Sequence, residues 1–129
     1  MSKDANDGRF IAEIGVSMAV ERLLREGYHV ALPVIDDGYD LVAFLGRRHW
    51  RLQVKATASA GRNGNRIRIR RGARKVESYS PKHVDAFILV HTGTRAVMCV
   101  PVARAQGAWV TFRSIEKYND FGILKTISN

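Results

Sequence analysis

The sequence predicts an α+β fold in which a mixed central sheet is flanked by helices, an α/β/α-like arrangement. Three observations predict it: one amphipathic helix opens the chain, short strand candidates follow in pairs, and 129 residues that are 46% hydrophobic suffice for one core. We expect a single domain over residues 1–129, with its core at about residues 8–102. Residues 103–129 form a C-terminal extension to which the sequence assigns no role.

The first half of the chain reads as a helix followed by three strands. Apolar residues recur at helical spacing through residues 10–26, and Gly27 follows where a helix commonly ends. Residues 28–34 are rich in β-branched residues and predict a strand. Residues 41–45, apolar on both faces, and residues 49–56 predict two further strands, which should pair as a hairpin.

A basic ribbon is predicted in the middle of the chain. Residues 65–71 alternate basic and apolar side chains, which places Arg66, Arg68 and Arg70 on one face of a strand and the isoleucines on the other. A ribbon of this size has the dimensions to enter the major groove of DNA.

The second half predicts another hairpin. Residues 84–91 and 96–102 are apolar strand candidates joined by the turn-forming residues 92–95. The last residues are less regular, and they allow a short helix at 103–106, a strand at 109–112 and a turn near 119–120.

The net charge of +9 and the sequence pI of about 10.3 indicate a polyanionic partner. Residues 41–76 contain no acidic residue and hold 11 of the 21 lysines and arginines, whereas a solvated surface would interleave both signs. We expect this run to hold the phosphate backbone of a nucleic acid. Its candidate DNA contacts are Arg47, Arg48, Arg51, Arg62, Arg66, Arg68, Arg70, Arg71, Arg74 and Lys75.

Other global features exclude several classes of protein. The single cysteine, Cys99, lies in an apolar run, so a disulfide scaffold within one chain and a cysteine-rich zinc site are excluded. No apolar stretch approaches the roughly 20 residues needed to cross a bilayer. We expect a cytoplasmic protein, associated with the DNA of the nucleoid, and no membrane partner.

Asp40, Gln53 and Lys55 are the candidate catalytic residues. Alternation along the second hairpin strand puts Gln53 and Lys55 on one face, and a two-residue loop at Arg47 and Arg48 would place Asp40 opposite Lys55. The oxygens of Asp40 and Gln53, with the Val54 carbonyl, suit Mg²⁺, or Mn²⁺ as a substitute. A metal there would activate water for phosphodiester hydrolysis, and Lys55 would orient that water and offset developing charge.

These residues resemble the PD-(D/E)xK nuclease superfamily. Tyr39-Asp40 stands where the family has Pro-Asp, and Gln53-x-Lys55 stands where it has an acid, any residue and lysine. The resemblance is strongest to small group I intron-encoded homing endonucleases, and next to archaeal-type Holliday junction resolvases. It implies a restriction-endonuclease-like core and a helix-borne acid, Glu13, that completes the metal site. Glu21 on the same helix is the rival for that role.

We therefore expect a Mg²⁺-dependent DNA endonuclease of the homing type. A structure-specific nuclease of the Holliday junction resolvase type is the alternative, and a catalytically degenerate DNA- or RNA-binding module is an alternative of another class. The expected substrate is double-stranded or branched DNA. Because one small domain carries one site and a duplex has two strands, we expect a homodimer or a homotetramer.

Overall fold

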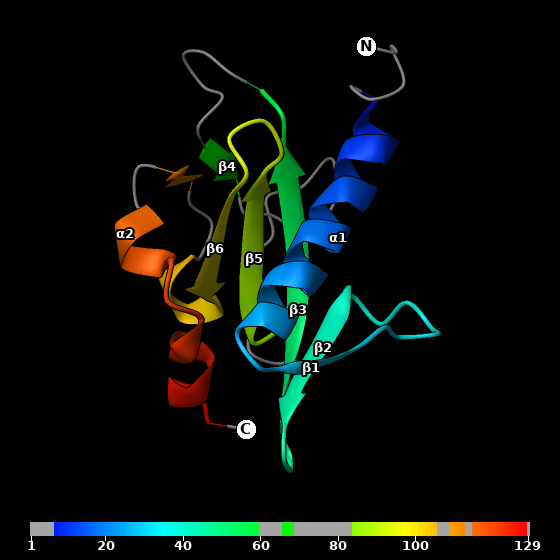
Figure 1. Ribbon diagram of the computed structural model, residues 1–129, viewed down its shortest axis with the longest axis vertical. Coiled ribbons are helices and arrows are strands. Elements are labelled where there is room, and N and C mark those ends of the chain that lie inside the picture. The colour runs from blue at the N-terminus through cyan, green and yellow to red at the C-terminus, as the bar shows by residue number, and fades with distance from the viewer. Residues whose placement is uncertain (1–6, 60–65, 69–83, 106–108, 113–114, 129) are drawn as a thin grey trace.

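The computed structural model describes residues 7–59, 66–68, 84–105, 109–112 and 115–128. A long helix lies across one face of a central sheet, and the C-terminal segments lie at the side of the sheet (Figure 1). In chain order the elements are α1 (Gly8–Arg25), β1 (His29–Ala31), β2 (Leu41–Leu45), β3 (Arg48–Thr57), β4 (Arg66–Arg68), β5 (Ala86–His91), β6 (Ala96–Pro101), the 3-10 helix η2 (Val102–Arg104), β7 (Trp109–Thr111), α2 (Ile115–Tyr118) and the 3-10 helix η4 (Phe121–Thr126).

Five strands form a mixed sheet in the order β1-β2-β3-β5-β6. β3 and β5 pair in parallel, and every other neighbouring pair in this sheet is antiparallel. The predicted mixed sheet with flanking helices is therefore confirmed, and both predicted hairpins are present. β3 lies in the middle of the sheet and is its longest strand.

The β2–β3 hairpin corrects the expected register. Its two-residue loop is Gly46 and Arg47, because Leu45 already pairs with Arg48. Gly46 has φ +62°, a conformation that glycine adopts without strain and that a tight two-residue loop requires at its first position. Starting the loop one residue earlier shifts the pairing by two positions, so Asp40, just before β2, lies beside Gln53 and Val54 rather than opposite Lys55.

Local capping explains where α1 begins and ends. The Asp7 side chain accepts a hydrogen bond from the Arg9 backbone N–H at 2.9 Å, which caps the first turn. Gly27 follows the helix with φ +90°, in the left-handed region that ends many helices. Leu23, together with the small residues of the buried face, packs against the sheet, while Ile14 is 40% exposed. The helix thus approaches the sheet through glycine and alanine, and part of the apolar stripe seen in the sequence faces outward.

Two core clusters cover the two faces of the sheet. On the α1 side, Leu23 and Trp50 pack with Phe121 and Leu124 of η4. On the other side, Phe87 and the rest of that cluster pack with the β4–β7 ribbon and with α2. Helices therefore flank both faces.

The C-terminal residues complete this fold. β7 pairs with β4, and the short helix and strand expected near residues 103–112 are present as η2 and β7. The sequence did not indicate α2 or η4. η4 buries Phe121 and Leu124 completely and holds Tyr28, whose hydroxyl donates to the Phe121 carbonyl at 2.7 Å.

Candidate active site

Asp40 lies at the point where β2 begins. Its backbone N–H donates to the Leu52 carbonyl at 2.9 Å, and its Oδ2 accepts from the Val54 backbone N–H at 2.8 Å. If the β2–β3 ladder continued, a backbone carbonyl of the next residue pair would accept the Val54 N–H. The Asp40 side chain accepts it instead. This contact holds the carboxylate against β3 between the two residues of the Gln-x-Lys motif.

Gln53 and Lys55 lie on the face of the sheet opposite α1. The intervening Val54 and the following Ala56 pack toward α1, and alternation places Gln53 and Lys55 on the other face. Both are half-buried. Their parallel partners on β5 are the buried residues Phe87 and Leu89, so an apolar strand backs the motif.

The Val54 carbonyl points to the same edge as the Asp40 carboxylate. In a strand the N–H and C=O of one residue point to the same side, and the Val54 N–H meets Asp40. β2 begins at Leu41, opposite Leu52, so the regular ladder does not extend to Val54. A second hard oxygen is thus available near Asp40.

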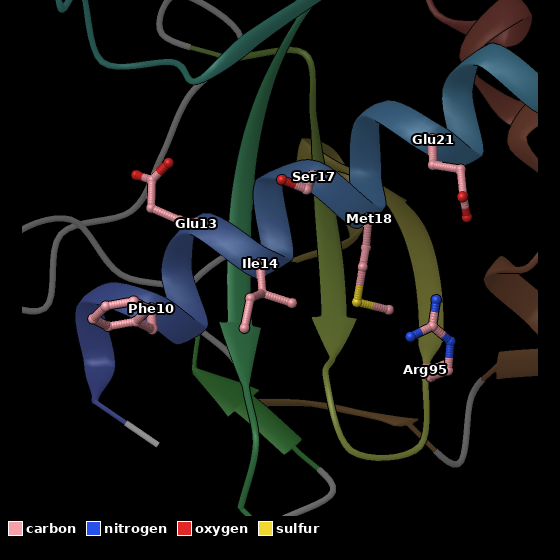
Figure 2. Close-up of a pocket in the computed structure, with 7 residues that line it drawn as sticks. All are labelled: Phe10, Glu13, Ile14, Ser17, Met18, Glu21 and Arg95. Atoms are coloured by element: carbon pink, nitrogen blue, oxygen red, sulfur yellow. The ribbon is translucent and has the colours of Figure 1, made fainter. Parts of the chain in front are cut away.

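Glu13 is the helix acid that the structure brings to Asp40. The two residues line one cavity of about 370 Å³, together with residues of the β1–β2 connection such as Asp36 and Tyr39. Glu21 lies about two turns further along α1 and does not line that cavity; it lines a second cavity with Arg95, which Glu13 also borders. Figure 2 shows Glu13 pointing away from the side of the helix that carries Ile14, while Glu21 extends toward Arg95.

The surroundings of Asp40 disfavour its charged form. Burial raises the pKa of Asp40 above its usual value, and the charges of Asp36 and Glu13 add to that rise. The hydrogen bond from Val54 and the charge of Lys55 act in the opposite direction on the same pKa. Asp36 is a neighbour that the sequence reasoning missed, although its place in the turn before Asp40 was a visible signal.

The number of acidic groups is small for a metal site. Within the part of the chain that the structure describes, no three histidine, cysteine or carboxylate side chains cluster as a metal-binding group. Gln53 stands where a second strand-borne acid would be expected, so the strand contributes an amide and a backbone carbonyl, while the carboxylates that line the cavity are Glu13, Asp36 and Asp40. Such hard oxygens suit Mg²⁺, which keeps several waters of its own.

Two of the candidate DNA-binding arginines have structural partners. Arg48 donates from Nη2 to the carbonyls of Lys125 and Ile127 at 2.7 and 3.2 Å, and its guanidinium lies over the Trp50 ring. Arg51 forms an ion pair with Asp85, Nε to Oδ2, at 3.4 Å. Sequence reasoning missed Asp85, whose signal was a single acid at the start of an apolar strand.

The remaining basic candidates are less fully described. Arg47 is exposed in the hairpin loop. Arg66 and Arg68 belong to β4, whose Ile67 is buried against the sheet, but the side chains of the two arginines lie outside the described part. Also outside the described residues are Arg62, Arg70, Arg71, Arg74 and Lys75.

Comparison with known proteins identifies the fold and then the family. The structure is similar to that of a bacterial homing endonuclease, I-Ssp6803I, with a TM-score of 0.65 and 20% sequence identity over 81% of this chain and 78% of that one. That likeness shows a PD-(D/E)XK nuclease fold. The model of the PD-(D/E)XK endonuclease family matches residues 7–122, and the chain belongs to this family.

No match was found among the curated proteins. In the described part of the chain, none of the helices has both the length and the apolar character needed to span a bilayer. Membership of an endonuclease family implies a nuclease enzyme, and such enzymes typically use divalent metals.

Proposed function

We propose that this protein is a metal-dependent DNA endonuclease of the homing type, which hydrolyses phosphodiester bonds with a metal-activated water. The observation that carries the proposal is the hydrogen bond from the Val54 N–H to Asp40, which holds a carboxylate beside the Gln53-x-Lys55 motif. Glu13 lines the same cavity as Asp40. The family of the chain and its likeness to a homing endonuclease support the reaction class.

The oxygen donors near Asp40 are of the chemical type that a hard divalent cation such as Mg²⁺ takes, with Mn²⁺ as a substitute. Asp40, the Gln53 amide oxygen and the Val54 carbonyl would hold it, and Glu13 would complete the set from α1. Burial and neighbouring carboxylates raise the pKa of Asp40, so a cation would offset negative charge that the cavity otherwise concentrates. When bound, the metal supplies Lewis-acid polarisation of the phosphate and a more acidic water.

Lys55 provides the positive charge of the site. It shares a face of β3 with Gln53, and its charge lowers the pKa of Asp40, so the two groups interact through space. We assign to the Lys55 ammonium the orientation of the attacking water and the stabilisation of charge on the phosphate oxygens, while the proton that the water loses passes to a neighbouring solvent molecule. Asp40 keeps its geometry during this step because Val54 holds one of its oxygens.

DNA would lie along the basic run of residues 41–76. The β4–β7 ribbon carries Arg66 and Arg68 beside the face that presents Lys55, and such a ribbon suits groove binding. Replacing Arg68 with alanine should lower the salt dependence of binding by about one phosphate contact. Double-stranded DNA is the proposed substrate, with branched DNA as the alternative of the resolvase type, and cutting both strands calls for a homodimer or homotetramer.

A catalytically degenerate DNA-binding module is the second candidate function. The observation that favours it is Gln53, which stands where the family has an acid. Besides Asp36, the described cavity then has only Asp40 and Glu13 as carboxylates. The same basic run would bind DNA in a protein that does not cut it. Catalysis and binding must therefore be measured separately.

Cleavage of supercoiled plasmid and of a synthetic four-way junction, in Mg²⁺, Mn²⁺ or EDTA, tests the proposal. The wild-type protein should cut in either metal and stop in EDTA, while D40N and K55M should each lose cleavage by about 100-fold or more. The matched control is D37N, which alters an exposed carboxylate of the same connection. Salt-sensitive binding without cleavage in any condition would reject the nuclease and support the degenerate module.

A further inference from the structure

Asp85 is a buried carboxylate that the proposed mechanism does not use. It is 7% exposed and precedes β5, between the fully buried Val84 and Ala86. Its Oδ2 accepts from the Arg51 backbone N–H at 2.7 Å and from Arg51 Nε at 3.4 Å, and its Oδ1 accepts from Nη2 at 3.5 Å. The Asp85 N–H also donates to the Arg51 carbonyl at 2.8 Å. Arg51 is thus bonded to Asp85 through both backbone and side chain.

These contacts lie on the face and the strand that carry the Gln-x-Lys motif. The parallel pairing of β3 with β5 begins at Leu52 and Ala86, one residue beyond Arg51 and Asp85. Alternation places Arg51, Gln53 and Lys55 on one face, about 7 Å apart in succession. Asp85 therefore holds β3 from the β5 side, two residues before Gln53.

Asp40 holds the same strand from the other side. It is bonded to Val54, and Asp85 is bonded to Arg51, so the two carboxylates lie on opposite flanks of the three residues 52–54. Sliding β3 by one residue would move Gln53 and Lys55 to the wrong face and break both contacts. These two contacts thus reinforce, on both sides of β3, the register that strand pairing gives to the motif.

Stability alone does not account for a charge at this position. A buried ion pair adds little net stability, because desolvation of both groups offsets their attraction. The next residues on this face of β5, Phe87 and Leu89, are apolar and fully buried, and an apolar residue at position 85 would continue their packing. A carboxylate there gains instead a fixed geometry for Arg51.

We propose that Asp85 is a positioning residue of the nuclease, which acts through Arg51 to hold β3 in the register that sets Gln53 and Lys55 beside Asp40. It also directs the Arg51 guanidinium along the face on which the substrate phosphate would lie. This inference rests on the proposed function, and it adds a residue outside the Asp/Gln/Lys constellation to the working site.

The test compares D85N with Y28F. D85N preserves the shape of the side chain and one oxygen acceptor but removes the charge, whereas Y28F removes a buried hydrogen bond on the opposite face of the sheet. Single-turnover cleavage at saturating DNA should fall about 10- to 100-fold in D85N, the range for residues that orient a metal site, and stay unchanged in Y28F. Hydrogen exchange of the Val54 amide should become faster in D85N only.

The outcomes separate this inference from the proposed function. If D85N and Y28F behave alike in both measurements, Asp85 is merely structural and the inference is overturned. If the wild-type protein does not cleave, the proposed function fails, and the Val54 exchange rate alone decides whether Asp85 holds β3. Should D85N fail to fold, R51M tests the same link from the arginine side, because it removes the partner of Asp85. In an R51M background, adding D85N is expected to lower cleavage no further than R51M alone.

Discussion

Replacing Gly15 with alanine should push α1 away from β3 and lower the stability of the protein. A Cβ at Gly15 would lie 2.6 Å from the Cβ of Ala56 and 3.8 Å from Cγ1 of Val54. Carbon atoms in good contact are about 3.5–4.0 Å apart, so helix and strand must separate by about 1 Å. Ala56 offers no relief by rotation because its Cβ is fixed to the strand backbone.

The size of the effect follows from two opposing contributions. Overpacking of this kind costs about 1–3 kcal/mol, while alanine in place of glycine favours a helix by about 1 kcal/mol. The expected net loss for G15A is about 1 kcal/mol, which corresponds to a Tm lower by about 3–5 °C for a chain of this length. Urea and thermal unfolding measure it.

Two variants check that reasoning. At Gly8, the first residue of α1, an added Cβ meets no atom within 4 Å, so G8A should be neutral or slightly stabilising. A56G combined with G15A should cost less than the sum of the single changes, because it removes the clashing atom. An increase in stability in G15A, as helix propensity alone would give, would refute the close approach of α1 to β3.

Three further predictions concern a buried thiol and two side chains that hydrogen-bond to the C-terminal segment. Cys99 is fully buried, and its thiol pKa is raised to about 12. Native protein at pH 8 should therefore resist a thiol-reactive dye that labels Cys99 at once in denaturant. Fast labelling of the native state would contradict its burial. R48M should lower the free energy of unfolding by about 1 kcal/mol, because Arg48 donates to the Lys125 carbonyl. The same change should leave the salt dependence of DNA binding unchanged, and a smaller salt slope would show instead that Arg48 contacts phosphate. Y28F should cost about 1 kcal/mol by leaving the Phe121 carbonyl unpaired. Burial raises the pKa of Tyr28, so the contribution of Tyr28 to the free energy of unfolding is complete below pH 10 and is lost as the pH rises further. If the free energy of unfolding of Y28F falls with pH above 10 as steeply as that of the wild type, this contribution is refuted.

Local patterns in the sequence were sufficient to predict most of the secondary structure. Helical spacing predicted α1, and strand patterning predicted β2 at its observed bounds. These patterns are local, since each depends on residues within one or two turns or on alternate positions of one strand. The short helices α2 and η4 escaped prediction because a single turn carries too little periodicity to be recognised, although η4 buries Phe121.

The members of the proposed site were readable from the sequence, but their spatial relations were not. The Gln53-x-Lys55 spacing on one strand placed both residues on one face, as alternation requires. Which residue faces Asp40 depended on where the hairpin loop begins, and the positive φ of Gly46 put Val54 rather than Lys55 against the Asp40 carboxylate.

The sequence by itself therefore determined the order of the long helix and the strands, the charge localisation and the members of the proposed constellation, because residue type and spacing act locally. Only the tertiary structure decided that Glu13 rather than Glu21 shares the cavity of Asp40, since that depends on how α1 lies on the sheet through Gly15. It also revealed that Asp85 holds Arg51, a contact between residues 34 positions apart that no local pattern encodes.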